Sequence, residues 1–219
     1  MKFLVLSDIH CREGVIDWAN DLAIRHQADG FLVLGDITHF GPASWADEFL
    51  SKLNGPSYAV PGNCDPYGTI EEIQKHAICL HGKKVRIGER MFGGWGGANT
   101  SIFNTPFEMP EEEILKGLRP IMERDMVLIT HCPPYSFNDF TVARRHAGSI
   151  AIHTLVDEFR PSAVISGHIH EARGIIEENG ILYMNPGAAK NGLSAILEVD
   201  SGVRGILLDP VSEHLPGGS

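Results

Sequence analysis

The feature that most constrains the fold is an alternation of short apolar runs with helical segments in the first third of the chain. Three apolar runs predict β-strands and the segment after each predicts a helix: residues 3–6, 15–26, 31–34, 45–53, 58–60 and 70–76. Parallel strands need crossover helices of this kind, and right-handed crossovers bring the carboxyl ends of the strands to one edge. The pattern therefore predicts a βαβαβ unit whose strands end side by side.

The remainder of the chain is richer in predicted strands than in helices. Strands are predicted at residues 85–87, 90–95, 126–130, 163–166, 173–178, 182–185, 194–199 and 203–208. Helices are predicted at residues 110–123 and 150–159, and the aperiodic segment 132–148 predicts a long functional loop. We expect an α/β fold in which two mixed β-sheets pack as a sandwich flanked by helices, a four-layer α/β/β/α arrangement.

Length and composition indicate how many domains the chain forms and in which cellular compartment it works. A chain of 219 residues with 43% hydrophobic content can bury a large core. We expect one domain over residues 1–210 and a flexible tail over residues 211–219, which contain Pro and Gly-Gly-Ser. The first apolar stretch is too short for a signal peptide, no span reaches transmembrane length, and the cysteines show no CxxC spacing. These features favour a cytoplasmic protein with free thiols.

The acidic charge balance limits the classes of partner. A formal net charge of −10 argues against an extended nucleic-acid-binding surface and against binding to an anionic membrane. It does not exclude a phosphate-bearing substrate, because two divalent metals reverse the sign of the local field in an acidic protein. Apolar strands in the second half are compatible with a homodimer, which periodicity alone does not establish.

Five short polar segments supply candidate metal ligands, and four of them follow an apolar run. They are Asp8-Ile9-His10, Gly35-Asp36, Gly62-Asn63-Cys64-Asp65, Thr130-His131 and Gly167-His168-Ile169-His170. Any one segment indicates little, since a lone His is more often a hydrogen-bonding group than a ligand. Together, at the ends of strands in one sheet edge, they indicate a two-metal centre. Because residues i and i+2 of an extended segment point the same way, residues 8 and 10, and residues 168 and 170, are expected to form chelating pairs.

The order DxH, GD, GNxD, H, GHxH resembles that of the calcineurin-like metallophosphoesterase superfamily. The matching motifs span residues 8 to 170, and the short length is similar to that of the small prokaryotic phosphodiesterase branch. The resemblance implies two metals that share Asp36 as a bridging ligand. One metal would be held by Asp8, His10, Asp36 and His170, and the other by Asp36, Asn63, His131 and His168.

Such a centre suits phosphoester chemistry because of what two neighbouring metal ions do to the substrate and to water. Two divalent ions roughly 3.5–4 Å apart clamp the phosphate oxygens, lower the pKa of a bridging water and stabilise an in-line displacement. Mixed oxygen and imidazole ligands suit Mn, Fe, Ni, Co or Zn better than Mg or Ca, and we expect Mn to serve in vitro. We therefore expect a phosphodiesterase that hydrolyses a small or nucleotide-like phosphoester by attack of metal-activated hydroxide, with Asp36, Asn63 and His131 acting through the metals.

Cys64 departs from the family pattern. Many members have His at this place, where it is proposed to protonate the leaving group, and a thiol is a poor substitute for an imidazolium cation. We predict weak monoesterase activity, with diesters still reacting. His39 is the nearest replacement candidate, a surface-loop His being the alternative, and Asp65 either orients a group at the site or stabilises its turn.

Asn99, Thr100 and Ser101 are candidates for lining a pocket beside the Gly-rich loop. Candidates for contacts to a substrate's phosphate or sugar are Arg144, Arg145 and His146, for which solvated loop charge is at least as strong an alternative. The competing functional hypothesis is an interaction scaffold that keeps the fold with little turnover, as the similar retromer subunit does. All seven ligand side chains are present, which favours the enzyme. A nuclease or protein phosphatase is disfavoured by the acidic balance and the absence of added recognition domains.

Overall fold

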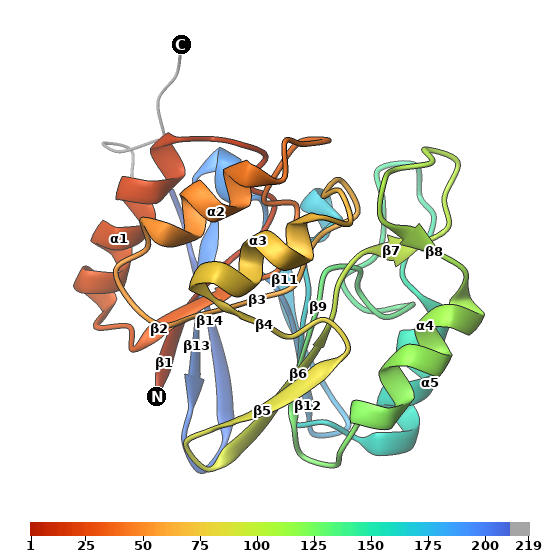
Figure 1. Ribbon diagram of the computed structural model, residues 1–219. Coiled ribbons are helices and arrows are strands. Elements are labelled where there is room, and N and C mark those ends of the chain that lie inside the picture. Colours follow the sequence, from red (N-terminus) through yellow and green to blue (C-terminus); the bar gives the residue numbers. More distant parts are fainter. Residues whose placement is uncertain (211–219) are drawn as a thin grey trace.

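Two six-stranded mixed sheets pack face to face, with helices on both outer faces (Figure 1). The computed structural model describes residues 1–210, and the tail predicted at residues 211–219 lies outside them. The four-layer α/β/β/α arrangement predicted from the sequence is confirmed. Within the described part of the chain, no helix is long and apolar enough to cross a lipid bilayer.

The first sheet contains the predicted βαβαβ unit. Its strand order is β14 (Val203–Leu208), β13 (Ser194–Val199), β1 (Lys2–Leu6), β2 (Gly30–Val33), β3 (Ser57–Ala59) and β4 (Ile78–Cys79). Strands β1 to β4 run parallel, so their carboxyl ends lie at one edge. Strand β13 pairs antiparallel with β1, so the two last strands join the first sheet. The outer face is covered by α1 (Gly14–His26), α2 (Ser44–Ser51) and α3 (Thr69–His76).

The second sheet has four parallel central strands with an antiparallel strand at each edge. Its order is β11 (Gly174–Glu178), β12 (Ile181–Asn185), β10 (Ala163–Ile165), β9 (Val127–Thr130), β6 (Arg90–Trp95) and β5 (Lys83–Ile87). Its outer face is covered by α4 (Glu111–Leu118) and α5 (Ile150–Phe159). A small parallel pair, β7 (Ala98–Asn99) and β8 (Glu108–Met109), extends the α4 side toward the loops described below.

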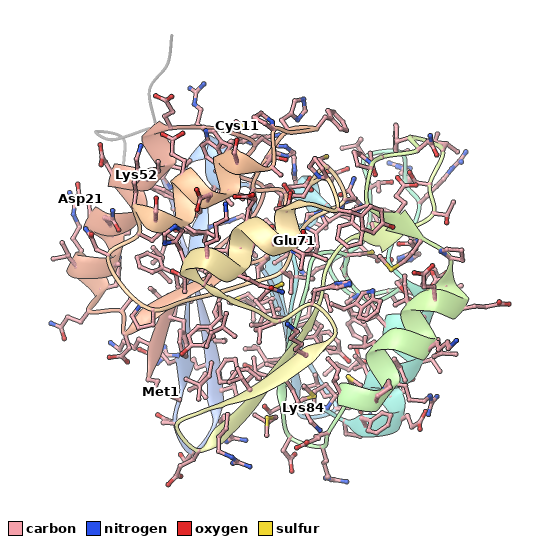
Figure 2. All side chains as sticks on the ribbon, viewed as in Figure 1. Met1, Cys11, Asp21, Lys52, Glu71 and Lys84 are labelled. Atoms are coloured by element: carbon pink, nitrogen blue, oxygen red, sulfur yellow. The ribbon has the colours of Figure 1, made fainter. Side chains whose placement is uncertain are left out.

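Side-chain alternation along each strand assigns residues to the layers. In β1, Phe3 and Val5 pack between the sheets, whereas Leu4 and Leu6 pack under the helices of the first sheet. In β9, Val127 packs between the sheets and the next residue lies under the helices of the second. Figure 2 shows the side chains filling these layers. Strands buried on both faces are continuous apolar runs, which is why the sequence pattern located them.

The structure corrects the predicted end of one helix. The helix predicted at residues 110–123 ends at Leu118 and continues only as a 3₁₀ turn, Arg119–Ile121. Pro120 has no amide hydrogen to donate to the preceding turn, so the α-helical hydrogen-bond ladder is interrupted there. Strands β4, β7 and β8 are two residues long and were not predicted, since no periodicity is visible over that length.

Candidate metal centre

Loops at the carboxyl ends of strands in both sheets bring the predicted ligands together. These loops follow β1, β2 and β3 in the first sheet and β9 and β10 in the second. Hydrogen bonds join them, among which His10 N donates to Asp36 O at 2.9 Å, and His168 N donates to Asp8 Oδ2 at 3.2 Å. The second of these bonds links the two sheets directly. All the ligands predicted from the sequence therefore lie in one region.

The backbone at the ligands is left-handed rather than extended. Asp8, His10, Asp36 and His168 have φ values of 57°, 49°, 49° and 68°, and His170 begins a 3₁₀ turn, His170–Ala172. The prediction that the two pairs chelate as extended i, i+2 pairs is therefore wrong in its geometry. Non-glycine residues with positive φ are uncommon and concentrate at functional sites.

One cluster contains Asp8, His10 and His170, whose ligand atoms all lie within 4.8 Å of one another. Asp8 Oδ1 lies 3.1 Å from His170 Nε2 and 3.9 Å from His10 Nε2. His10 Nε2 also lies 3.6 Å from Asp36 Oδ2. These contacts bring together the four residues that the family resemblance assigns to one metal.

The other oxygen of Asp36 faces a second cluster. Asp36 Oδ1 lies 3.4 Å from His131 Nε2, which in turn lies 2.8 Å from Asn63 Oδ1. The His168 ring packs edge-to-face on the His131 ring, with centroids 5.0 Å apart. His131 Nδ1 contacts Leu34 O at 2.7 Å, which fixes the ring with Nε2 toward the cluster. Asp36 thus presents one oxygen to each cluster, the arrangement that a bridging carboxylate requires.

Burial sets the protonation of two of these imidazoles. Burial lowers the pKa of His10 to about 4, against the opposing effect of Asp36. Burial and the neighbouring His131 lower the pKa of His168 to about 4. The contact with Asp8 instead raises the pKa of His170. His10 and His168 are therefore neutral at pH 7, which is the form that binds metals.

The donor set fits divalent metals. Asp8 Oδ1 and His10 Nε2 are buried and have no hydrogen-bond partner within residues 1–210. Burial raises the pKa of Asp8, but the contact with His170 and the charge of His131 outweigh it, so the pKa lies well below its usual range. A buried, ionised carboxylate beside the neutral imidazoles of His10 and His168 favours binding of a cation. Carboxylate, amide and imidazole ligands together suit transition metals or zinc.

The Asp65 carboxylate holds the loop that carries Asp36. Buried completely, it accepts hydrogen bonds from the backbone N–H groups of Ile37 at 3.2 Å, Thr38 at 2.7 Å and Gly62 at 2.7 Å. Burial and the nearby Asp36 charge raise its pKa to about 6. Asp65 therefore has both of the roles considered for it: it stabilises its own turn, and it orients the neighbouring loop that carries Asp36.

Gly62 is required for the close approach of two loops. A Cβ atom at this position would overlap the backbone and the carboxylate of Asp36. The glycine of the GNxD motif thus allows the loops after β2 and β3 to touch. The Cys64 amide then donates to Asp36 Oδ1 at 2.8 Å, which fixes that oxygen.

Cys64 and His39, the two further catalytic candidates, both lie next to the clusters. Cys64 is buried, and its Sγ lies within 4.8 Å of ligand atoms of His10 and Asp36. Burial, reinforced by the Asp36 carboxylate, raises the pKa of this thiol. His39 Nδ1 lies 3.2 Å from His10 Nδ1, and its ring packs on exposed Phe40. All four cysteines are free thiols, as predicted.

Thr105 was not identified from the sequence, yet it contacts a predicted ligand. Its Oγ1 accepts a hydrogen bond from Asn63 Nδ2 at 2.9 Å and donates to Glu108 Oε1 at 2.7 Å. With its nitrogen held there, the Asn63 amide turns its oxygen toward His131. The contact joins residues 42 positions apart, and no local signal in the sequence marks it.

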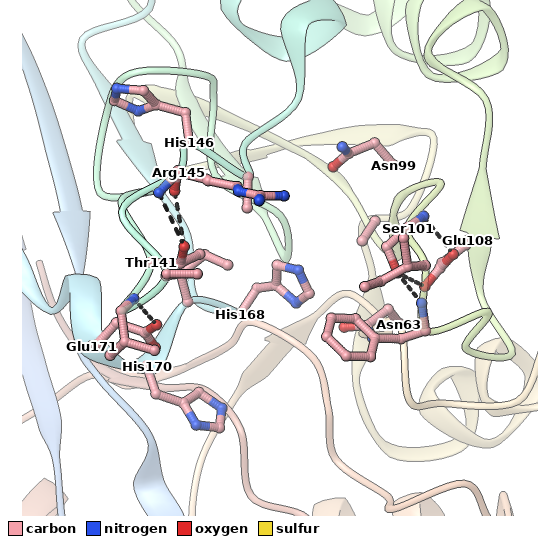
Figure 3. A pocket seen from close by; sticks show the side chains of 17 residues that line it. Asn63, Asn99, Ser101, Glu108, Thr141, Arg145, His146, His168, His170 and Glu171 are labelled. Carbon is pink, nitrogen blue, oxygen red and sulfur yellow. Dashed lines mark hydrogen bonds between the residues drawn. The ribbon is translucent and has the colours of Figure 1, made fainter.

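A cavity of about 520 Å³ opens beside the two clusters, and Asn63, His168 and His170 line it (Figure 3). Of the candidate substrate contacts, Asn99, Ser101, Arg145 and His146 line the cavity, whereas Thr100 and Arg144 do not. The candidate centre is therefore accessible to a small ligand from one side.

Comparison with known proteins identifies the family. The model of the calcineurin-like phosphoesterase family matches residues 1–172, and the chain belongs to this family. An uncharacterized protein of Methanocaldococcus jannaschii is 34% identical over 168 residues, which cover 73% of this chain and 77% of that protein. Family membership and the cluster of Asp and His side chains indicate a phosphoester hydrolase that uses divalent metals. The resemblance predicted from the motifs is confirmed.

Solved structures share the fold at low sequence identity. A dimetal phosphatase from Danio rerio aligns with a TM-score of 0.65 and 12% identity, covering 94% of this chain and 98% of that one. A structure described as a novel archaeal phosphodiesterase aligns with a TM-score of 0.51 and 20% identity, and the alignment covers 95% of this chain and 100% of that one. At these identities the likeness concerns the fold alone.

Proposed function

We propose that this protein is a binuclear metal-dependent phosphodiesterase. The single observation that carries the proposal is the placement of Asp36, whose Oδ2 faces His10 and whose Oδ1 faces His131. Around it lie the other six ligand side chains of the family pattern. A carboxylate shared in this way offsets the repulsion between two cations held close together.

The residues present fit the ligand set implied by the family resemblance. One metal would be held by Asp8, His10, Asp36 and His170, and the other by Asp36, Asn63, His131 and His168. A bound metal pair would neutralise the charge on the phosphoryl oxygens and activate water as the nucleophile. We propose Mn as the metal that supports activity in vitro, because the donor set mixes oxygen and nitrogen ligands.

Contacts within the chain orient these ligands. Asp65 holds the Asp36 loop through three backbone N–H groups. Thr105 orients the Asn63 amide, and Leu34 O fixes the His131 ring. Such contacts to the partners of metal ligands commonly change metal affinity or activity by about 10–100-fold when removed.

The preference for diesters rests on Cys64. Its thiol stands beside the ligands where many family members carry an imidazole, and it brings no positive charge to the leaving group. Reaction of a monoester dianion benefits most from such a proton donor, so its absence disfavours monoesters more than diesters. A structural relative described as an archaeal phosphodiesterase is compatible with this preference.

The test compares two aryl substrates with the Mn-loaded protein. We expect faster hydrolysis of bis(p-nitrophenyl) phosphate than of p-nitrophenyl phosphate. We expect close to two metal ions per chain by elemental analysis, and loss of both activity and part of the bound metal in Asp36→Asn. Faster turnover of the monoester would contradict the diester preference, and full activity of Asp36→Asn would contradict the metal centre.

A further inference from the structure

The cavity beside the metal centre is much larger than a phosphate group requires. Two loops form its walls: residues 99–108, between β7 and β8, and residues 141–147, which follow β9 (Figure 1). The same cavity includes Asn63 and His168, so its inner end is continuous with the candidate metal centre. A phosphoester bound at the metals would therefore place one of its organic groups between these loops.

The tips of both walls are apolar and exposed. Ile102 is 94% exposed, Phe103 is 78% exposed and Val142 is 84% exposed, and all three line the cavity. None of the three belongs to a core cluster of the described chain. Large apolar side chains that contribute nothing to the core and gather at the mouth of a cavity mark a binding surface for an apolar group.

Two carboxylates that line the cavity, Glu108 and Glu171, hold the loops that form its walls. Glu108 accepts hydrogen bonds from the N–H and hydroxyl groups of both Ser101 and Thr105, at 2.7 to 3.1 Å. Glu171 Oε1 accepts from Val142 N at 2.8 Å. These bonds fix the loop that carries Phe103 and the loop that carries Val142, so both apolar walls are preorganised.

Arg145 supplies the cationic group of the cavity. Its backbone is held in a tight turn, because Thr141 N and Thr141 Oγ1 both donate to Arg145 O, at 2.9 and 3.0 Å. Figure 3 shows its side chain directed into the cavity, toward the side where Asn99 lies. Within residues 1–210 its guanidinium has no hydrogen-bond or ion-pair partner. An unpaired guanidinium facing a cavity in a chain of net charge −10 fits an anionic ligand group.

We infer that the substrate is a phosphoester whose organic group has a flat, apolar part and a second anionic group. The flat part packs between Phe103 and Val142, and the second anionic group binds Arg145. This inference rests on the proposed function, because it takes the phosphoryl group to lie at the metal centre. It narrows the substrate to aryl-like or base-like esters that carry an additional carboxylate or phosphate.

Phosphonates test the inference without turnover, because their P–C bond is not hydrolysed. We would measure dissociation constants by calorimetry for the Mn-loaded protein with methylphosphonate, phenylphosphonate, the 3- and 4-carboxyphenylphosphonates and the matching neutral carboxamides. We expect the phenyl group to improve affinity by about tenfold. We expect a carboxylate in at least one position to add about tenfold over its carboxamide, as a charge-assisted bond does.

Two variants assign these gains to residues. Phe103→Ala should remove the gain from the phenyl group and Arg145→Gln the gain from the carboxylate, each leaving methylphosphonate binding unchanged. Arg144→Gln is the matched control, since Arg144 is the neighbouring exposed arginine and does not line the cavity. Equal affinity for methyl- and phenylphosphonate, or equal losses in the two arginine variants, would overturn the inference.

The result is separable from the proposed function. If the protein selects carboxyphenylphosphonate but hydrolyses no phosphoester, the binding site stands and the proposed activity fails. If it hydrolyses simple diesters but binds all the phosphonates equally, the activity stands and the inference about the substrate fails.

Discussion

At the scale of single residues, Cys64 is the position where this chain departs most clearly from its family. Its thiol lies beside His10 and Asp36, so a side chain at this position is within reach of the reacting groups. Replacing it with imidazole should supply the missing proton donor. We predict that Cys64→His raises the ratio of monoester to diester turnover by about tenfold or more, given the usual size of general acid catalysis.

The matched control is Cys64→Ala, which removes the thiol without adding a donor. Its substrate ratio should equal that of the unchanged protein. Both ratios are measured with Mn-loaded protein and the two p-nitrophenyl substrates. An equal rise in Cys64→Ala would show that space, and not proton donation, sets the preference.

Thr105 gives a second prediction at this scale. Thr105→Val keeps the shape of the side chain but removes both the acceptor for Asn63 Nδ2 and the donor to Glu108. The Asn63 amide is then free to turn its oxygen away from the cluster. We expect the affinity for one of the two Mn ions to fall by roughly tenfold in calorimetric titrations of metal-free protein.

A conservative substitution distinguishes loss of the Asn63 orientation from a general loss of structure. Thr105→Ser retains the hydroxyl group and should bind Mn as the unchanged protein does. Thr100→Val, at an exposed neighbour outside the cavity, should also have no effect. Weakened Mn binding in Thr105→Ser to the level of Thr105→Val would contradict the role of the hydroxyl group.

The candidate ligand residues could be singled out from the sequence because they follow buried strands and belong to motifs with local spacing. The groups that position them could not. Thr105 lies 42 positions from Asn63, and Leu34 O, which fixes His131, is 97 positions away. The left-handed backbone of Asp8 and Asp36 was also missed, because only the folded loops impose it. Local sequence patterns carry the identity of ligands but not the contacts that orient them.

At the scale of elements, Glu111 joins two helices. It stands in the first turn of α4 but accepts hydrogen bonds from the first turn of α5: Ser149 Oγ at 2.6 Å, Ile150 N at 3.0 Å and Ala151 N at 2.8 Å. Ser149 in turn caps α5 by accepting from Ile152 N at 3.1 Å. A carboxylate at a helix N-terminus also interacts favourably with the helix dipole.

We predict that Glu111→Ala lowers the free energy of unfolding by about 2 kcal/mol, since a charged acceptor of several hydrogen bonds is lost. Urea denaturation of the metal-free protein measures the change. The neighbouring exposed residue provides the control, because Glu112→Ala should change stability by less than about 0.5 kcal/mol. Equal effects of the two substitutions would mean that the contact contributes nothing.

Among the elements, strands buried on both faces were predicted within one or two residues because their apolar runs are unbroken. The end of α4 was mispredicted because amphipathic periodicity continues past Pro120, although the backbone does not. The pairing of β13 with β1 was beyond prediction, since it joins the two ends of the described chain. Periodicity locates a strand, but it says nothing about its neighbour in the sheet.

At the scale of the whole molecule, His81 couples stability to pH. Its Nδ1 accepts a hydrogen bond from Gly96 N at 2.9 Å, and the ring packs on Trp95 and Phe107. Burial lowers the pKa of His81 to about 4 from an ordinary value near 6.5. The unfolded chain therefore binds a proton at this residue in the range where the folded chain does not.

The sign follows from that difference. As the pH falls from about 6.5 to 4, the His81 contribution to the free energy of unfolding decreases by roughly 3 kcal/mol at most, and above pH 7 it stays constant. His81→Asn retains an acceptor for Gly96 but does not titrate. Subtracting its stability curve from that of the unchanged protein, both without metal, should give this slope; a flat difference would contradict it.

The hydrogen bond from His168 N to Asp8 Oδ2 and the contact of His131 with Leu34 both cross from one sheet to the other. The metal centre therefore lies on a seam: Asp8, His10, Asp36 and Asn63 belong to loops of one sheet, and His131, His168 and His170 to loops of the other. Ions bound there would cross-link the two sheets in addition to their shared core. Chelation should consequently raise amide hydrogen exchange at the carboxyl ends of β1, β2, β9 and β10 at the same time, while the edge strand β5, which leads into no ligand loop, keeps its protection. A rise in exchange in only one sheet would contradict this expectation, because it would show that the ions stabilise the loops of that sheet alone. Removal of the ions would then loosen the contact between the two sheets as well as abolish the proposed activity.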